Sequence, residues 1–136
     1  MISAIAPSEI TRLWPLYSDG IENCLEKGVG KWTAADVLEM AESGAWLIFV
    51  VHEGDQVRAT IVANIESGKD RILEVGMAWG EGLADWTLEV HDCMMKVARE
   101  LNCKTVTVTG RRGWAKHLQQ YGFKEKMITM ARSVNG

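Results

Sequence analysis

The sequence predicts a single domain of mixed α and β structure, residues 1–136, with a central, mostly antiparallel sheet of about six strands and helices on both faces. Its length of 136 residues suits one hydrophobic core but not two independent ones. The spacing at which hydrophobic residues recur changes along the chain, from the three- to four-residue steps of a helix to the alternation of a strand and back again. Three strands in succession favour antiparallel pairing, and the strand–helix–strand units that follow favour a parallel crossover.

The first part of the chain predicts a short strand followed by a helix. Residues 1–6 read as the strand, and Pro7 and Ser8 suit a helix start, since proline is tolerated in a first turn and serine caps. Apolar residues then recur at three- and four-residue steps until shortly before Gly28. Pro15 lies inside this helix and predicts a kink or a break there.

A second helix and three strands follow. Thr33 and Asp36 have the spacing of a capping box, with aspartate in place of the usual glutamate, and the helix that they begin is expected to end near Ser43. The pattern then becomes apolar or alternating, interrupted by turns rich in glycine and aspartate. The strands are expected at residues 46–52, 57–65 and 71–78.

The last part of the chain alternates helix and strand. The longest amphipathic helix is expected over residues 83–101, where apolar side chains keep to one face. Residues 104–109 are β-branched and alternating, which is typical of a strand. A short helix over 111–121 and a last strand over 123–133 complete the predicted sheet.

Composition excludes several function classes. Lys and Arg number 15 against 18 Asp and Glu, which argues against a nucleic-acid binder. No apolar stretch is long enough for a membrane span, and the N-terminus does not read as a signal peptide. The three cysteines form no Cys-x-x-Cys pair and fit a reducing compartment. The histidines lack metal-ligand spacing, so no metal is expected.

A glycine turn connects the third predicted strand of the middle region to the long helix. It reads Met77-Ala78-Trp79-Gly80-Glu81-Gly82. Glycines allow a backbone to approach a pyrophosphate, and a helix N-terminus attracts its charge. Together with the order of elements, this turn resembles the GNAT family of N-acetyltransferases, whose members carry Arg/Gln-x-x-Gly-x-Gly/Ala here. The first position of that motif is methionine in this chain.

The resemblance implies acetyl-CoA as the cofactor. The implied cofactor contacts are Val75, Met77, Gly80, Gly82, Leu83, Arg111, Arg112 and Trp114. An alternative for the glycine turn is a helix start capped by its own acidic residues, Glu81 and Asp85, which would repel a pyrophosphate. The arginine pair could bind cofactor phosphates or another anion, or form surface ion pairs. Trp79 and Trp86, like Trp114, are expected near the cleft that would hold the cofactor.

The short C-terminal helix carries the second point of resemblance. GNAT enzymes commonly have a tyrosine four residues before a Gly-Phe pair, and that tyrosine protonates the leaving thiolate of coenzyme A. Here Gly122-Phe123 is present, but the tyrosine position holds Leu118, flanked by His117 and Tyr121. The sequence of this segment is most similar to that of small GNAT-like proteins of tailed bacteriophages.

Three residues are therefore candidates for catalysis: Glu74, His117 and Tyr121. Glu74 lies on a strand that faces the amine substrate in GNAT enzymes and could act as a base, or it could simply face solvent. His117 has an ordinary pKa of about 6.5 and could move protons, or it could be an exposed helical histidine. Tyr121 could replace the missing acid only if its helix were turned.

Two functions of different classes follow. The first is an acetyl-CoA-dependent N-acyltransferase acting on a small-molecule or protein amine, in which backbone N–H groups near Val75 to Ala78 polarise the thioester carbonyl. The second is a catalytically inactive GNAT-like phage protein that binds a protein partner in a virion or a host complex, with an exposed tryptophan such as Trp32 at the interface. Either protein is expected in the bacterial cytoplasm or in the virion. No membrane or nucleic-acid partner is expected.

Overall fold

A computed structural model describes residues 1–28, 30–110 and 112–135, with the backbone alone at Leu83, Ala84 and Arg112. A 3-10 turn over Pro7–Glu9 precedes α1, and another over Gln119–Tyr121 follows α4. None of the described helices is long and apolar enough to span a membrane. The elements in chain order are β1 (Ile2–Ala4), α1 (Ile10–Lys27), α2 (Ala34–Glu42), β2 (Trp46–Glu53), β3 (Gln56–Ser67), β4 (Arg71–Gly80), α3 (Leu83–Glu100), β5 (Thr105–Val108) and α4 (Arg112–Leu118).

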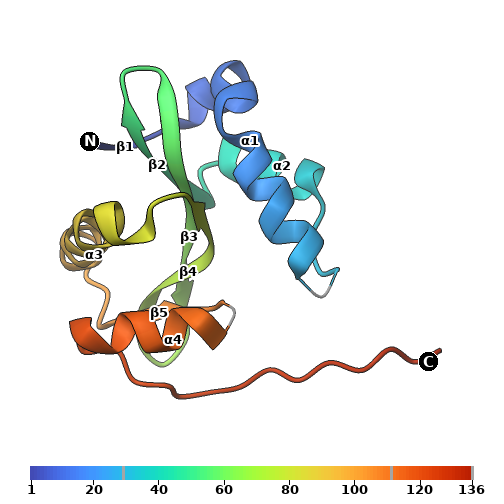
Figure 1. Ribbon diagram of the computed structural model, residues 1–136, viewed down its shortest axis with the longest axis vertical. Coiled ribbons are helices and arrows are strands. Elements are labelled where there is room, and N and C mark those ends of the chain that lie inside the picture. The colour runs from blue at the N-terminus through green and yellow to red at the C-terminus, as the bar shows by residue number, and fades with distance from the viewer. Residues whose placement is uncertain (29, 111, 136) are drawn as a thin grey trace.

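The sheet has five strands in the order β1-β2-β3-β4-β5 (Figure 1). Neighbouring strands from β1 to β4 are antiparallel, whereas β4 and β5 are parallel. Helix α3 makes the crossover from β4 to β5, as the strand–helix–strand pattern predicted. The predicted mixed and mostly antiparallel sheet is therefore confirmed, with five strands in place of about six.

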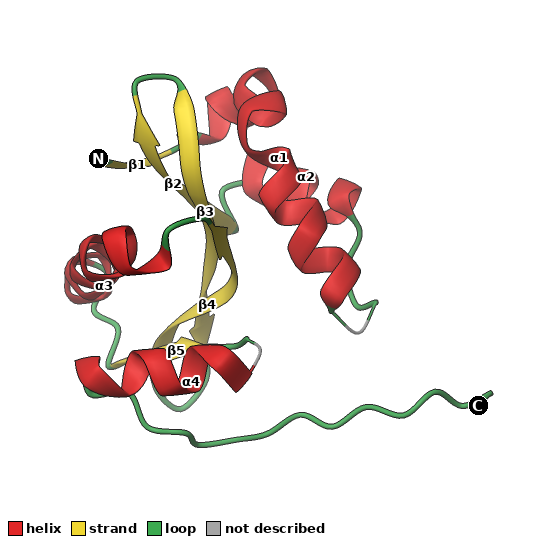
Figure 2. Cartoon of the chain, viewed as in Figure 1, coloured by secondary structure: helices red, strands yellow, loops and turns green. Residues whose placement is uncertain are grey.

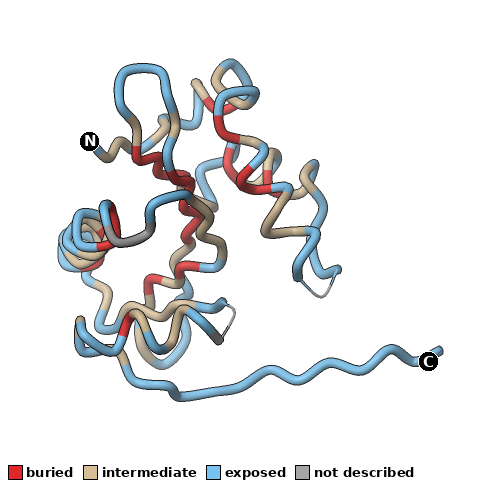
Figure 3. The backbone as a smooth tube through the Cα atoms, viewed as in Figure 1, coloured by how far each residue is buried: buried red, intermediate tan, exposed pale blue. Residues whose placement is uncertain are grey.

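Helices cover both faces of this sheet (Figure 2). On one face, α1 and α2 pack against β2, β3 and β4 around a core that contains Val62 of β3. On the other face, α3 packs against β4 and β5 around a core that contains Ile61 of the same strand. The buried residues accordingly concentrate in the strands and in α1 (Figure 3). Alternation along each strand divides its side chains between two apolar cores.

The start of α2 forms as the sequence predicted. The Thr33 hydroxyl accepts a bond of 3.2 Å from the Asp36 N–H, and the Asp36 carboxylate accepts one of 2.9 Å from the Thr33 N–H. Both halves of the capping box are therefore present, although aspartate replaces glutamate. Helix α3 also spans nearly the expected residues, since its amphipathic pattern is long and uninterrupted.

A kink or a break was expected at Pro15, and the structure shows no break there. Helix α1 continues through Pro15 for 18 residues, from Ile10 to Lys27. Proline costs a helix its own N–H bond and some steric strain. Here Ile10 is buried on one side of Pro15, and Tyr17 and Ile21 are buried on the other. We infer that burial of the helix on both sides outweighs the local cost.

The last strand, expected over residues 123–133, is also absent. Beyond the 3-10 turn the chain is extended but pairs with no strand in the described structure, and it leaves the domain as a tail (Figure 1). We call residues 124–135 the C-terminal tail. The prediction rested on local β propensity, which indicates an extended backbone but does not provide a partner strand.

Candidate functional site

Strands β4 and β5 part to leave one edge of β4 open. They pair from Ile72 opposite Thr105 as far as Val75 opposite Val108. The Thr109 N–H still donates to the Val75 carbonyl, at 3.0 Å, but β5 has ended. Strand β4 continues to Gly80, paired with β3 alone. The two parallel strands and the loop after β5 therefore bound a wedge, which we call the β4–β5 wedge.

An irregularity in β4 marks the start of this wedge. The register with β3 shifts so that Val75 lies opposite Ala63 while Met77 lies opposite Val62, leaving Gly76 as an extra residue. Such a bulge changes which backbone groups point to which edge of a strand. The Ala78 carbonyl accepts a bond from the Cys24 thiol of α1, at 3.6 Å. The Glu81 N–H donates to the Arg58 carbonyl of β3, so by alternation the main-chain groups of Ala78 point away from β3, to the edge beside the wedge.

The glycine turn leads directly from β4 into α3. A Cβ at Gly80 would lie 2.6 Å from the Ala59 Cβ and 2.8 Å from the Trp86 ring, so only glycine fits there. Gly82 has a φ of +64° and precedes the first residue of α3. The indole N–H of Trp86 donates to the Glu81 carbonyl at 2.8 Å, which fastens the turn to the helix. The turn is therefore rigid and opens α3 beside the wedge.

Part of the turn is already occupied by the protein's own groups. The Glu81 N–H donates to the Arg58 carbonyl at 3.2 Å, so it does not point at a ligand. The Asp85 carboxylate lies 2.9 Å from where a Cβ of Gly82 would be, over the start of α3. A carboxylate there interacts favourably with the helix dipole and repels a phosphate. No side chain forms a cap hydrogen bond at the start of α3, so Asp85 acts on the helix start through its charge.

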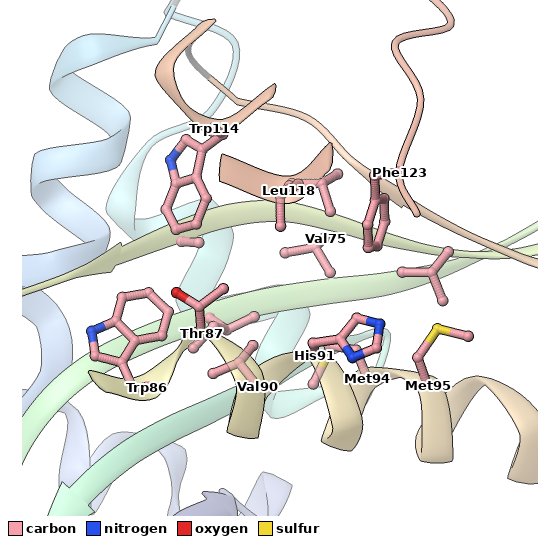
Figure 4. Close-up of a pocket in the computed structure, with 14 residues that line it drawn as sticks. Val75, Trp86, Thr87, Val90, His91, Met94, Met95, Trp114, Leu118 and Phe123 are labelled. Carbon is pink, nitrogen blue, oxygen red and sulfur yellow. The ribbon is translucent and has the colours of Figure 1, made fainter. Parts of the chain in front are cut away.

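A small apolar cavity lies between α3 and α4, against the sheet (Figure 4). Its volume is about 40 Å³, and it is surrounded by side chains of β4, β5, α3 and α4. In Figure 4, Trp114 and Leu118 approach it from α4, while Trp86 and Val90 approach it from α3. The cavity lies on the face that carries Val75, next to the wedge.

Two contacts join α3 and α4 beside this cavity. The rings of Trp86 and Trp114 lie 6.1 Å apart, centroid to centroid, at a tilted angle. The His117 Nε2 and the Thr87 hydroxyl are 3.0 Å apart, within hydrogen-bond distance. Thr87 is buried and His117 half-buried, so this polar contact is largely shielded from solvent. The two helices are therefore held together along the sheet face where a ligand in the wedge would have to lie.

Glu74 lies on the opposite face of the sheet. It pairs with Asn64 of β3, which in turn lies opposite Trp46 in the core beneath α1 and α2. The Thr109 hydroxyl donates to the Glu74 carboxylate at 3.4 Å, at the mouth of the wedge. Burial raises the pKa of Glu74, and the neighbouring carboxyl of Glu66 raises it further. Thr109 and Lys31 oppose this rise only in part.

The structure thus brings two of the three catalytic candidates together. The rings of His117 and Tyr121 lie 6.3 Å apart, and Tyr121 stacks on His91 of α3 at 5.0 Å. Glu74 is separated from them by the sheet, and the wedge is where the sheet opens between them. Leu118, in the position of the usual acid, is buried at the cavity.

The predicted cofactor contacts are also divided between the faces. Val75 and Trp114 line the cavity, and Gly80 and Gly82 form the turn. Met77 points to the α1 side, where it packs against the core that contains Val62. Arg111 lies outside the described residues, as do the side chains of Leu83 and Arg112.

Trp79 does not lie at the cavity. It packs closely over Gly20 of α1, where its ring would be 3.0 Å from an added Cβ. Sequence reasoning missed Cys24, Thr87 and His91, which contact the wedge or the cavity. Thr87 and His91 are four residues apart on α3, so helical spacing could have placed them on one face, but not which helix that face meets. Among the described residues, no three His, Cys, Asp or Glu side chains are arranged to hold a metal ion.

Comparison with solved structures gives clear similarity of fold. A predicted acetyltransferase from Clostridium acetobutylicum, solved with acetyl-CoA, has a TM-score of 0.71 at 11% identity, over 99% of this chain and 96% of that one. An aminoglycoside acetyltransferase from an uncultured soil metagenomic sample, solved with trehalose, has a TM-score of 0.71 at 10% identity, over 98% and 95%. Glucosamine-6-phosphate N-acetyltransferase from Arabidopsis thaliana has a TM-score of 0.68 at 16% identity, over 98% and 97%.

These likenesses show that the chain has the GNAT acetyltransferase fold over nearly its whole length. No protein-family model matches the chain, and no curated protein matches it in sequence. At such low identity a shared fold does not carry over substrates or residue roles, so those must be argued from the site itself.

Proposed function

We propose that this chain is an N-acyltransferase that transfers the acetyl group of acetyl-CoA to an amine. The observation that carries the proposal is the β4–β5 wedge, in which β4 runs on past Val75 with one edge unpaired and then turns at Gly80 into α3. An unpaired strand edge offers backbone N–H groups to a polar, extended ligand such as the pantetheine arm of coenzyme A. When bound, acetyl-CoA supplies the acetyl group as a thioester.

The backbone of β4 would activate the carbonyl. By alternation from Glu81, which bonds β3, the main-chain groups of Ala78 point to this edge, and its carbonyl already accepts a bond from Cys24. An N–H fixed at this edge can stabilise negative charge that develops on a carbonyl oxygen, because the strand holds it in place before the reaction begins. Binding both reactants in the wedge would supply the rest of the rate enhancement through proximity.

Glu74 is the proposed base. An amine must lose a proton before or while its nitrogen attacks the thioester carbon, and the raised pKa of Glu74 makes its carboxylate a better acceptor for that proton. Glu74 reaches the mouth of the wedge through Thr109 and lies on the α1 side, so the amine would enter from that face. The carbon–sulfur bond then breaks and the thiolate takes up a proton from His117, Tyr121 or water.

The two halves of coenzyme A fit this site unequally. The open edge suits the pantetheine arm, whereas Glu81 and Asp85 disfavour phosphates at the start of α3. We propose Arg111 and Arg112 as the compensating cations. The double variant Glu81→Gln/Asp85→Asn should therefore bind acetyl-CoA about five- to tenfold more tightly, equivalent to about 1 kcal/mol. The control is Glu39→Gln at an exposed position of α2, which packs against β2 and α1 and not against the turn.

The direct test is binding and turnover. Acetyl-CoA at about 100 times its dissociation constant should stabilise the chain by about 2.7 kcal/mol, measured as a thermal shift. Transfer is then followed as thiol release with primary amines. An aminoglycoside and glucosamine 6-phosphate are suitable first acceptors, because proteins of this fold are named for acetylating them. A chain that shows no shift at millimolar acetyl-CoA would not be an acyltransferase.

One observation favours a second candidate, a GNAT-fold protein without catalysis. The contacts of Trp86 with Trp114 and of Thr87 with His117 hold α3 and α4 together beside the wedge. In that role the chain would act by contact, as a virion-associated or host-directed phage protein would. Trp32, with 40% of its surface exposed, is suitable interface material. Turnover separates the candidates, because an acyltransferase releases free thiol from acetyl-CoA when an amine is present, whereas a GNAT-fold protein without catalysis releases none.

A further inference from the structure

A second cavity lies beside the start of α1, away from the β4–β5 wedge. Its volume is about 390 Å³, within the range of pockets that hold small organic molecules. Its walls come from β1 and the segment after it, from the first half of α1, and from the hairpin that joins β2 to β3. The tip of this hairpin and the first turns of α1 lie at the same end of the molecule (Figure 1). We call this space the α1–hairpin cavity. None of its described lining residues belongs to β4, β5, α3 or α4, so it is separate from the wedge.

Several side chains of the α1–hairpin cavity are fixed before any ligand arrives. Tyr17 is buried there, and its hydroxyl donates to the Ile10 carbonyl at 2.8 Å. The ring of His52 is held at both nitrogens. Its Nδ1 lies 2.8 Å from the Gly54 carbonyl, and its Nε2 lies 2.8 Å from the Ser3 hydroxyl. Side chains that are already ordered lose little conformational entropy when a ligand binds, so the cavity is preorganised.

The acidic side chains that line this cavity carry no matching positive charge of their own. They are Asp55 of the hairpin and Glu9 before α1, and no Lys or Arg is among the described lining residues. Asp55 is exposed and forms no ion pair in the described part of the chain. One Glu9 oxygen accepts from Arg12, which lies outside the cavity lining, and the other oxygen has no hydrogen bond among the described residues. The cavity is therefore electronegative and attracts a positively charged ligand.

Most of the other side chains in the cavity lining are apolar. Leu13, Ile5 and Val57 are half-buried there. Leu16 is 51% exposed on α1 and forms part of the same lining. An apolar ligand surface placed against these side chains would be removed from water together with them, which favours binding. The lining therefore suits a molecule with an apolar body and one charged end.

We propose that the α1–hairpin cavity binds a small organic cation, a protonated or quaternary amine attached to an apolar body. The carboxylates of Asp55 and Glu9 bind the charged group, and Leu13, Leu16 and Val57 contact the apolar body. No bond of the ligand is made or broken at this site. The proposal therefore does not depend on acetyl transfer, and it assigns a function to a cavity that the proposed reaction does not use.

The first test compares a cation with an uncharged compound of similar shape by titration calorimetry. The cation is N,N-dimethylbenzylamine, which is protonated at neutral pH and, as a tertiary amine, cannot form a stable acetyl amide. The uncharged compound is benzyl alcohol. The amine should bind about tenfold more tightly, because two partly exposed carboxylates together contribute about that factor. Equal affinities for the two compounds would overturn the proposal.

Variants assign the preference to the two carboxylates. Glu9→Gln/Asp55→Asn should lower the affinity for the amine to that for the alcohol and leave the affinity for the alcohol unchanged. The matched control is Glu39→Gln, which removes a carboxylate from an exposed position of α2 that does not line the cavity. A double variant that kept the preference for the amine would show that these carboxylates do not bind it.

The second test locates the ligand. The amine should shift the amide signals of Ser3 and Gly54 in nuclear magnetic resonance spectra and leave that of Val75, at the wedge, unchanged. Leu16→Trp, which places a larger side chain at an exposed position of the lining, should weaken binding of both compounds at least tenfold. A shift at Val75 alone would mean that the amine enters the wedge. Absence of binding at about 10 mM, weak even for a small fragment, would mean that the cavity takes no such ligand. Either result contradicts the proposal, and neither bears on whether the chain binds acetyl-CoA.

Discussion

Three groups crowd the position that a Cβ would take at Gly80. The Ala59 Cβ would lie at 2.6 Å, the Trp86 ring at 2.8 Å and the Arg58 carbonyl at 2.9 Å. Trp86 is itself buried and the Arg58 carbonyl belongs to β3, so neither can move aside easily. Gly80→Ala should therefore lower the free energy of unfolding by about 1–3 kcal/mol, the usual cost of overpacking a core. Urea denaturation measures this loss.

Gly76 provides the control on the same strand. An added Cβ there would meet no atom within 4 Å, and the residue does not need a positive φ. Gly76→Ala should change the free energy of unfolding by less than about 0.5 kcal/mol. If the two alanine variants were equally stable, the close approach of β3, β4 and α3 at the glycine turn would be wrong.

Glu74 should make stability depend on pH. Burial and Glu66 raise the pKa of Glu74 in the folded state above its ordinary value of 4.5, so the folded chain holds this proton more tightly than the unfolded chain. The contribution of Glu74 to stability is then fully present below pH 4.5 and is lost as the pH rises through the folded-state pKa. Glu74→Gln cannot ionise and should melt at a higher temperature than the natural chain at pH 8, but not at pH 4.

The comparison needs a charge control. Glu39→Gln removes one carboxylate from an exposed position on α2 and should leave the melting temperature nearly unchanged at both pH values. If the gain from Glu74→Gln were as large at pH 4 as at pH 8, it would come from packing, and the raised pKa of Glu74 would not be its cause.

At the scale of elements, α1 carries the cost of a proline in its interior. Pro15 is exposed and lacks the N–H that would donate to the Thr11 carbonyl. Pro15→Ala should therefore raise the free energy of unfolding by about 1–3 kcal/mol, up to the difference in helix propensity between the two residues. Leu16→Ala, at the next exposed position, is the control and should have little effect. A destabilised Pro15→Ala variant would mean that the proline ring makes a favourable contact.

Local sequence predicted most helices and strands, but it did not predict which of them would pair or pack with distant parts of the chain. The capping box at Thr33 and the amphipathic pattern of α3 depend on neighbours in sequence, and both were predicted correctly. The strand expected over 123–133, and whether the helix breaks or continues at Pro15, depend on distant partners. A strand needs an edge to pair with, and a proline in a helix is tolerated only if tertiary packing compensates for it.

The candidate site shows the same division. Gly82 could be predicted because it meets a local requirement, a positive φ, whereas Gly80 is required by the close approach of β3 and Trp86. The placing of Glu74 on one face of the sheet and His117 on the other could not be predicted from the sequence, since it depends on which helix covers which face. The β4 bulge at Gly76 likewise places Met77 on the α1 side. The side chain of Trp86 was expected near the cleft and is buried at the cavity.

For the whole molecule, the sheet belongs to two cores at once. Ile61 and Val62 are neighbours on β3, and each is buried in the core on its own face. Neither core can lose its strands without exposing the other. We therefore expect one unfolding transition in urea. Its midpoint should be the same by circular dichroism and by tryptophan fluorescence at a fixed protein concentration.

Truncating either residue tests this coupling. Ile61→Ala should cost about 2–5 kcal/mol, since it leaves a cavity beneath α3, and Val62→Ala should cost somewhat less beneath α1. Both variants should shift the single transition to lower urea without splitting it, because the strand that they weaken is common to both cores. A biphasic curve for either variant would mean that one face can unfold while the other stays folded, and the wedge between β4 and β5 could then open without loss of the α1 core.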